Sequence, residues 1–322
     1  MRLGSILLIL IIGFFFATCG DEEPTIIDVS SEWNRSNLNP VFRDLIPEEN
    51  YEVASDPHVF YDENGSLKMI YSGDMDGHTS IKLANGTSPS NWEKDQALLY
   101  EVGSSGRDIH KETAFYRKSS SGKHQIYYIG YSNVETYQSE VYMAEADQLT
   151  GPYTQMELPV VPRGTLANKD VYLITSPSIV EHEDKLFMCF LGWNDSPGEV
   201  TEIWVIGATS TDDGHSWTDF QIVDTRIGAE GQVTKVKENE FVAVRTSTYQ
   251  DKEAIFYATA SHPFGPWNEQ SEPILIQQNP VFEKDEVIAP QITIDPDTGE
   301  EYLYYTGADH QAGWWIMLAT KK

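Results

Sequence analysis

The chain has 322 residues, a length that one closed all-β architecture can reach without division into separate domains. Its 50 acidic and 22 basic residues give a formal net charge of −28, so the bulk surface would repel a nucleic acid or another extended polyanion. These numbers argue against a nucleic-acid partner and favour a ligand that is neutral or weakly charged.

The first 18 residues have the character of an export signal. They contain an apolar run that is short for a membrane-spanning helix, followed by small residues and then by Cys19. The run Phe16-Ala17-Thr18-Cys19 resembles a bacterial lipobox, in which the cysteine becomes the lipidated first residue of the mature protein. An ordinary signal peptide with a chance cysteine is the alternative. We expect residues 1–18 to be a lipoprotein signal peptide, and lipid on Cys19 to anchor the exported protein to a bacterial membrane, at the outer membrane or the cell surface.

Residues 19–31 are acidic and contain a proline, which suits a solvated tether between the lipid and a folded domain. With Cys19 used for lipid, Cys189 is the one remaining cysteine, and it lies in the apolar run LFMCFLG. A small buried thiol is the expected state of such a cysteine, so no disulfide framework is expected. Residues 32–322 remain for the folded domain.

This folded part contains five copies of a repeat at intervals of roughly 54 to 64 residues, near the range of propeller repeats. Each copy has a first strand, a polar turn, an apolar second strand and a third strand. A fourth strand with an aromatic residue near its start completes the first four copies. The first strands begin at Asp56, Glu112, Ser176, Glu230 and Ala289.

The fifth copy lacks a fourth strand because the chain stops at Lys322, but residues 32–42 supply a candidate. That segment, EWNRSNLNPVF, has the same tryptophan-then-apolar outline as the fourth strand GPWNEQSEPIL. A ring of sheets left open would expose an unpaired edge, and closure by one strand from each terminus removes it. We predict an all-β, five-bladed β-propeller whose last blade is closed by the N-terminal strand. A β-sandwich does not account for five matching units.

Function is expected where the first strands meet, because in a propeller they line the central channel. Three of the five positions, Asp56, Glu112 and Glu230, are carboxylates. A single carboxylate at a strand start usually caps a turn or is solvated. Three that converge raise one another's pKa, so that one can act as an acid while another stays ionised.

Cleavage of a glycosidic bond requires such a set. One protonated carboxyl group donates to the leaving oxygen, and an ionised one activates water from the opposite face, at a separation of about 6.5–9.5 Å in inverting enzymes. The channel mouth of a small propeller offers a gap of that order.

Several short motifs resemble glycoside hydrolase family 43 and its five-bladed relatives. They are the DP pair at Asp56, the EG pair at Glu230, and the strands LTGPYTQ and PFGPWNE, and the likeness covers nearly everything from Trp33 onward. No single motif is long, so the specificity lies in their order and spacing. The resemblance implies that Asp56 is the general base and Glu230 the general acid.

The chain departs from that family at Ser176, where the pattern has a third-blade Asp that orients the acid and adjusts its pKa. Three explanations remain. The favoured one is that Glu112, at the neighbouring second-blade position, supplies the missing charge. Alternatively, Asp170 swings in from the preceding loop, or the site is impaired and the protein binds sugar without cleaving it.

Three further residues are candidates for substrate binding. Arg245, a charge on an apolar strand, could contact a sugar or Glu230, or could form a structural ion pair. Trp193 could stack on a sugar ring at the channel mouth or pack between blades. His310 could reach the axis and contact a water or an ion, or remain a solvated loop histidine.

The residue pattern indicates neither a metal site nor a cofactor site. No His or Cys spacing is that of a zinc site, and a calcium ion in the channel, known in relatives, is not supported by these residues. We therefore expect no cofactor.

The sequence thus predicts an exported, lipid-anchored, monomeric glycosidase of the inverting type with a carbohydrate substrate. The resemblance alone implies that it acts on pentose units, such as xylose or arabinose, in plant or algal polysaccharides. Two alternatives stay open. One is a non-catalytic surface glycan-binding propeller, prompted by Ser176, and the other is a related hydrolase of different sugar specificity, such as anhydro-galactose or fructose units.

Overall fold

The computed structural model describes residues 32–46, 51–75, 77–101, 103, 106–134, 136–194, 202–224 and 230–321. Within these residues every helix or strand element is a strand, β1 to β24, which confirms the all-β prediction. A search of the same residues finds no helix that could cross a membrane. The predicted signal peptide and tether, with Cys19, lie outside the described residues.

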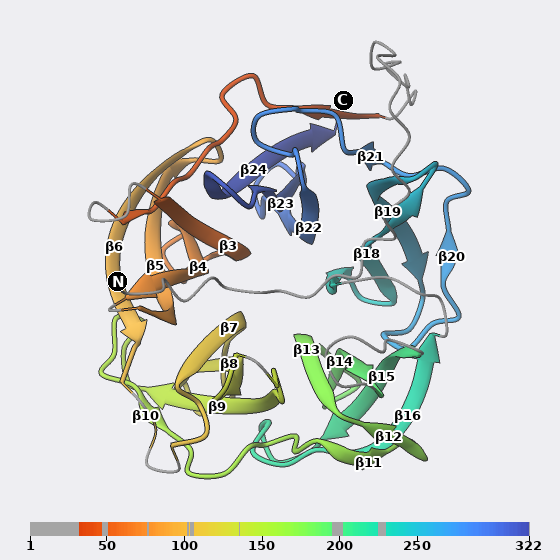
Figure 1. Ribbon diagram of the computed structural model, residues 1–322. Coiled ribbons are helices and arrows are strands. Elements are labelled where there is room, and N and C mark those ends of the chain that lie inside the picture. The colour runs from red at the N-terminus through yellow and green to blue at the C-terminus, as the bar shows by residue number, and fades with distance from the viewer. Residues whose placement is uncertain are drawn as a thin grey trace.

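The strands form groups that stand around a central axis, each an antiparallel meander with its first strand nearest the axis (Figure 1). The first group is β3 (Tyr51–Tyr61), β4 (Leu67–Met75), β5 (His78–Ser88) and β6 (Asn91–Leu99), with β2 (Leu45–Ile46) paired to β3. The second group is β7 (His110–Lys118), β8 (His124–Tyr131), β9 (Glu140–Ala146) and β10 (Thr154–Gln155).

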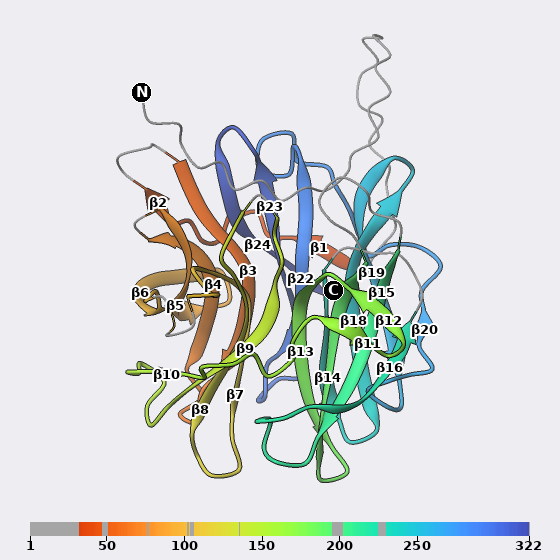
Figure 2. The same ribbon diagram turned by 60° about the horizontal axis from the view of Figure 1, so that its bottom comes forward.

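The next two groups continue this order. The third group is β13 (Leu173–His182), β14 (Lys185–Trp193), β15 (Ile203–Ser210) and β16 (Thr218–Asp224), preceded by a ribbon of β11 (Gly164–Leu166) and β12 (Lys169–Val171). The fourth group is β17 (Gly231–Lys237), β18 (Glu240–Tyr249) and β19 (Lys252–Ala260), with β20 (Asn268–Glu269) and β21 (Leu275–Ile276) both paired to β19. Figure 2 shows these groups from the side.

The last group joins the two ends of the described chain. It consists of β22 (Glu286–Ile294), β23 (Glu301–Asp309) and β24 (Gly313–Lys321), and β1 (Trp33–Arg35) pairs antiparallel with β24. The same N-terminal segment continues along β24, because the Asn39 side chain hydrogen-bonds the backbone of Leu318 in both directions, at 2.9 and 2.8 Å. The segment that the sequence offered as a missing fourth strand thus lies on the last strand of the chain.

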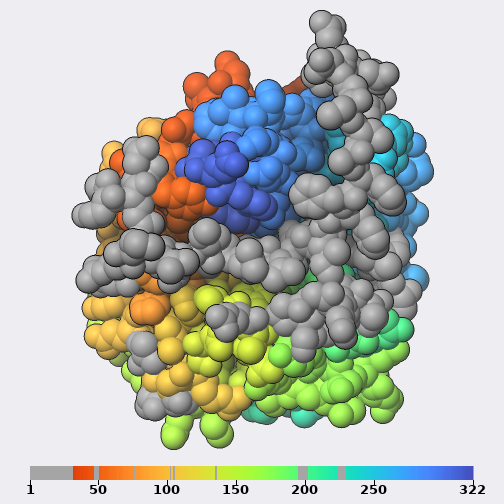
Figure 3. Space-filling model, viewed as in Figure 1, coloured from red at the N-terminus to blue at the C-terminus, as the bar shows by residue number. Residues whose placement is uncertain are grey.

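Apolar clusters fill the space between neighbouring groups. One cluster spans each successive pair of groups, and another joins the fifth group to the first. In that last cluster Phe42 meets Tyr71 edge to face at 4.9 Å, and red-orange and blue atoms touch in Figure 3. Second strands such as β14 are buried on both faces because a neighbouring group covers each side, which explains their continuous apolar sequences.

Cys189 lies within β14 as a buried thiol, as the sequence predicted. Burial raises the pKa of this thiol to about 12. A thiol in this state is a packing group rather than a nucleophile.

Candidate active site

A hollow forms where the five first strands converge. Each strand contributes two consecutive residues to it. These pairs are Asp56-Pro57, Thr113-Ala114, Ser176-Pro177, Glu230-Gly231 and Ala289-Pro290, with Gln232 completing the lining. The convergence expected of the first strands is therefore present, and it brings Asp56 and Glu230 into one hollow.

The backbone has an unusual conformation at the first member of every pair. The φ angles of Asp56, Thr113, Ser176, Glu230 and Ala289 are 51°, 46°, 51°, 24° and 49°. Non-glycine residues rarely adopt positive φ, and a β-branched threonine does so least of all. In four of the strands a shift in ladder register marks the same place, so these pairs are bulges. Repeated strain at one point of convergence is typical of a functional site.

Asp56 is surrounded by hydrogen-bond donors. The Ser55 hydroxyl donates to its Oδ2 at 3.0 Å, and the Thr113 backbone N–H donates to the nearby Ser72 hydroxyl at 3.2 Å. Burial raises the pKa of Asp56, and these donors lower it in part because they stabilise the ionised form. Asp56 is the carboxyl group of the hollow that is best suited to be an anion.

Glu230 has the opposite environment. Burial raises its pKa well above the ordinary value, and the negative charges of Asp56, Glu112 and Glu286 raise it further. Its Oε2 is buried without a hydrogen-bond partner among the described residues. Glu230 is therefore the carboxyl group that keeps its proton.

The two carboxyl groups are hydrogen-bonded to each other, and this contact lowers the pKa of Asp56 while it raises that of Glu230. Of the two groups, Glu230 is therefore the one that favours the protonated form. The separation of about 6.5–9.5 Å expected for an inverting pair with a sugar between its members stays a prediction.

The repeat predicted that Glu112 lines the hollow, but the structure places it one residue before the position that does. Thr113 occupies the equivalent place in the hollow, whereas Glu112 remains in the regular ladder opposite Ile129. Its buried carboxylate accepts hydrogen bonds from the hydroxyls of Tyr131 at 2.6 Å and Tyr137 at 3.0 Å. Burial, and after it the charge of Asp56, raises the pKa of Glu112 to about 7. The residue therefore acts on the pair through its charge.

The alternative replacement for the missing acid, Asp170, does not reach the hollow. It is exposed on β12, paired with Thr165 in the ribbon beside the third group (Figure 1). The Ser176 position is left neutral, and its backbone N–H donates to the Thr113 hydroxyl at 3.4 Å.

Glu286 is a fourth buried carboxylate near the hollow that sequence reasoning missed. Its charge raises the pKa of Glu230, and its own pKa is raised first by burial. His310 Nε2 lies 2.8 Å from Glu286 Oε1, and this hydrogen bond raises the pKa of the half-exposed imidazole. His310 therefore faces a carboxylate next to the site and also stands partly in solvent.

The other two predicted binding residues are placed differently. Arg245 forms a two-bond ion pair with Glu269, with Nε at 2.7 Å and Nη2 at 2.8 Å, and its guanidinium lies over the Phe256 ring. This bears out the structural ion-pair interpretation. Trp193 is half-buried at the end of β14, and its Nε1 is buried without a hydrogen-bond partner among the described residues.

A metal centre is not formed by the part of the chain that the structure describes, since no group of three or more His, Cys, Asp or Glu there could hold an ion. What the hollow does offer is proton chemistry. It combines an ionised carboxylate, a protonated one in contact with it, and a third carboxylate whose pKa lies near 7. Such a set can donate and accept a proton on one substrate.

Comparisons of this chain with known proteins identify solved structures that share its fold. No protein-family model matches the chain, and no curated protein sequence matches it. An α-L-arabinofuranosidase from Podospora anserina, solved in complex with cellotriose, is similar with a TM-score of 0.65 and 10% identity, covering 90% of this chain and 96% of the other. An endo-arabinase from Bacteroides thetaiotaomicron gives 0.63 and 11%, covering 83% and 93%, and a thermostable family-43 glycoside hydrolase gives 0.63 and 16%, covering 83% and 88%. At these identities the likeness shows that this chain shares the fold of solved glycoside hydrolases.

Proposed function

We propose that residues 32–322 form a five-bladed β-propeller whose last blade is closed by β1, and that it hydrolyses glycosidic bonds in the central hollow. The observation that carries this proposal is the proton-sharing pair of Asp56 and Glu230 at the convergence of the first strands. The fold shared with solved glycoside hydrolases supports it.

Glu230 is the general acid in this proposal and Asp56 the general base. Glu230 donates its proton to the glycosidic oxygen as the bond from that oxygen to the anomeric carbon breaks. Asp56 accepts a proton from the water whose oxygen attacks the anomeric carbon from the opposite face. Each turnover therefore leaves Glu230 ionised and Asp56 protonated.

The contact between the two carboxyl groups gives this cycle a way to reset. When product leaves and the groups meet again, the proton on Asp56 can pass directly to Glu230, whose environment favours the protonated form. Entry of the next sugar then has to part the pair. We propose that Glu112 is a positioning residue that keeps the pKa of Glu230 high, which replaces the charge missing at Ser176.

The finer identity of the substrate is part of the proposal. We propose pentose units, xylosyl or arabinosyl, in plant or algal polysaccharides, and inversion at the anomeric carbon. The family resemblance and the arabinose-directed names of two enzymes with this fold support this choice. We further propose that the protein is exported, lipidated on Cys19 and held at a bacterial membrane, on the basis of the N-terminal sequence. We also propose that it is monomeric.

The test is a screen of aryl β-xyloside, aryl α-arabinofuranoside and algal oligosaccharides with the wild type, Glu230→Gln and Asp56→Asn. We expect the wild type to hydrolyse at least one of them and each variant to lose about 100-fold or more of kcat. Proton NMR of the first-formed anomer checks inversion. Activity that survives in both variants would contradict the assignment of the pair.

One observation favours a second function, glycan binding without cleavage. Ser176 leaves the ring of five hollow positions with two carboxylates. If wild type and Glu230→Gln are equally inert on the whole panel and still bind oligosaccharide equally well, the binding function replaces the enzymatic one.

A further inference from the structure

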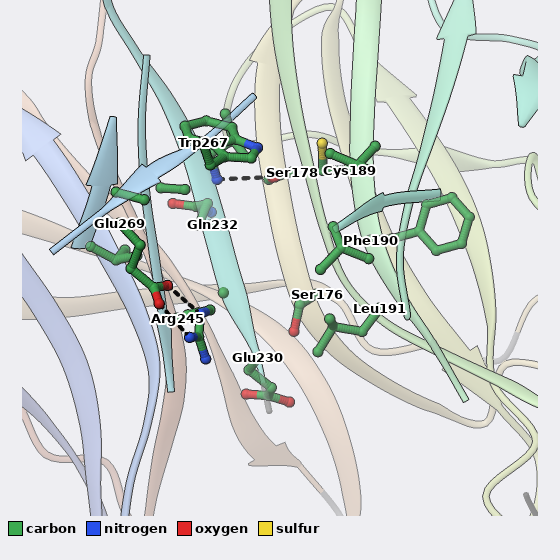
Figure 4. Close-up of a pocket in the computed structure, with 17 residues that line it drawn as sticks. Ser176, Ser178, Cys189, Phe190, Leu191, Glu230, Gln232, Arg245, Trp267 and Glu269 are labelled. Atoms are coloured by element: carbon green, nitrogen blue, oxygen red, sulfur yellow. Dashed lines mark hydrogen bonds and ion pairs between the residues drawn. The ribbon is translucent and has the colours of Figure 1, made fainter. Parts of the chain in front are cut away.

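The central channel continues past the hollow into a cavity of ≈ 370 Å³, which we call the far cavity. Its lining includes a residue from each of the five first strands, namely His58, Phe115, Ile179, Gln232 and Gln291. Gln232 lines both the hollow and the far cavity, so its side chain stands at the boundary between them. In Figure 4, Glu230 lies at the start of β17 and Gln232 lies farther along the same strand.

A hydrogen bond crosses the channel at this boundary. Gln232 Nε2 lies 3.2 Å from His58 Nδ1, and His58 Nε2 lies 3.2 Å from the backbone oxygen of Tyr116 on β7. A carbonyl oxygen can only accept, so Nε2 carries the hydrogen of the imidazole ring. Burial lowers the pKa of His58 to about 3, so the ring is neutral and its Nδ1 accepts from Gln232. We call this contact the cross-channel bond.

The cross-channel bond joins strands that are not neighbours around the axis. His58 lies on β3 of the first group and Gln232 on β17 of the fourth, and the fifth group stands between them (Figure 1). Asp56 and Glu230 each lie two residues before a member of this bond. The segments that carry the acid and the base are therefore linked twice, once by the carboxyl pair in the hollow and once at its boundary with the far cavity.

A second glutamine at the same level joins neighbouring strands instead. Gln291 Oε1 accepts from the backbone N–H of Val59 at 2.6 Å, and its Nε2 donates to the backbone oxygen of Val59 at 2.8 Å. These bonds connect β22 to the adjacent β3. Gln291 follows Ala289 by two residues, as Gln232 follows Glu230, so it offers the same residue type on a strand without an acid in the hollow.

We propose that the cross-channel bond fixes the separation of β3 and β17, so that His58 and Gln232 are positioning residues for the acid and the base. This inference rests on the proposed function, because it concerns the distance between the two carboxyl groups during hydrolysis. Beyond the bond the channel opens into the far cavity, so the described side chains do not fill the axis there. A shift of about 1 Å in a reacting group can cost about 100-fold in rate.

The pKa of Glu230 responds to this separation and can be measured without turnover. Burial raises that pKa most, and the charge and hydrogen bond of Asp56 raise it further, so a longer distance between the two groups lowers it. The other groups around Glu230 are unchanged in the variants below; they are Glu112 on β7, Glu286 on β22, Ser176 on β13, and Arg245 on β18 in its ion pair with Glu269.

The experiment compares wild type, Gln232→Met and Gln291→Met, since methionine resembles glutamine in shape but cannot donate a hydrogen bond. Carbon NMR of protein labelled at the glutamate carboxyl groups gives the pKa of Glu230, whose signal is identified by its loss in Glu230→Gln. We expect this pKa to fall by roughly one unit in Gln232→Met and to stay within about 0.3 units in Gln291→Met. On a hydrolysed glycoside, kcat of Gln232→Met should fall about tenfold or more, with KM within about twofold.

His58→Phe removes the acceptor at the other end of the cross-channel bond, and it takes the place of Gln232→Met if that variant does not fold. The double variant of His58→Phe and Gln232→Met should lower the pKa of Glu230 no further than either single one, because both break the same bond.

The outcomes separate this inference from the proposed function. An unchanged pKa of Glu230 in Gln232→Met, or an equal fall in Gln291→Met, would overturn the positioning role even if the wild type hydrolyses a glycoside. A protein that shows the expected pKa changes but is inert toward every glycoside would instead contradict the hydrolase, while the effect of the cross-channel bond on the carboxyl pair stands.

Discussion

At the scale of single residues, the neighbours of each carboxyl group in the hollow decide how readily it keeps its proton. Asp56 accepts a hydrogen bond from Ser55, and the neighbouring Ser72 and Thr113 also lower its pKa, whereas Glu230 faces three other carboxylates. Donors stabilise a carboxylate and like charges destabilise it, so the proton goes to Glu230. Glu112 contributes to this difference although it does not line the hollow.

Glu112→Gln tests that contribution. Removing its charge lowers the pKa of Glu230, so the alkaline limb of the kcat/KM profile moves to lower pH, by roughly one unit. KM at the optimum stays within about twofold, because Glu112 does not line the hollow. Glu63→Gln, the same substitution at an exposed residue, is the control and leaves the profile unchanged. An alkaline limb that does not move in Glu112→Gln would show that Glu112 has no influence on the acid.

At the scale of strands, the repeat predicted the order of the elements correctly but misplaced the second copy by one residue. The second copy was aligned on its acidic residue, but the shared feature of the five positions is a bulge with positive φ at Asp, Thr, Ser, Glu and Ala. Residue type does not specify such a bulge, so the sequence could not place Thr113. Glu286 was missed because it lies in the ladder before the fifth bulge, outside any motif. The tyrosines that hold Glu112 were indistinguishable in the sequence from packing residues.

The N-terminal strand is an element whose importance can be measured. Trp33 on β1 is buried against Tyr257 and the cluster between the fourth and fifth groups, whereas Leu38, five residues on, is 60% exposed. Trp33→Ala should lower the free energy of unfolding by about 3 kcal/mol, and Leu38→Ala by less than about 0.5 kcal/mol. Urea denaturation gives both values. Equal stabilities for the two variants would mean that β1 does not hold the ring together.

At the scale of the whole molecule, the buried acidic residues lower the free energy of unfolding as pH rises. Burial raises the pKa of Glu112 and Glu253 from 4.5 to about 7, and the pKa values of Asp56, Glu230 and Glu286 are raised too. The folded state therefore binds protons more tightly than the unfolded state. The free energy of unfolding is largest below about pH 4.5 as far as these groups are concerned, and declines as pH rises toward 7 and beyond.

We accordingly expect these carboxyl groups to lower the melting temperature as pH rises from 5 to 8, against the opposite contribution of His58 and His110, whose pKa values burial lowers to about 3 and about 4. Glu230→Gln should flatten the decline and raise the melting temperature at pH 8, because it removes a buried acid surrounded by like charges. Differential scanning calorimetry at constant ionic strength measures both effects. If the melting temperature of Glu230→Gln changes between pH 5 and pH 8 as that of the wild type does, the raised pKa of Glu230 is contradicted.

The order of the strands could be predicted best, because the sequence shows five repeats of apolar strands and a separate strand near its N-terminus. The contact between Asp56 and Glu230 was not, since it depends on how closely the five strands approach the axis. The electrostatic roles follow from donors and charges that lie far apart in the sequence.

The central claim, that Glu230 protonates the leaving oxygen while Asp56 activates water, is tested most directly by leaving-group dependence. The measurement is kcat/KM for a phenyl and a 2,4-dinitrophenyl glycoside of the preferred sugar, in wild type and Glu230→Gln. Dinitrophenolate leaves without a proton, so Glu230→Gln should lose about 100-fold or more on the phenyl glycoside and little on the dinitrophenyl one. Equal losses on the two substrates would contradict the assignment of Glu230 as the acid.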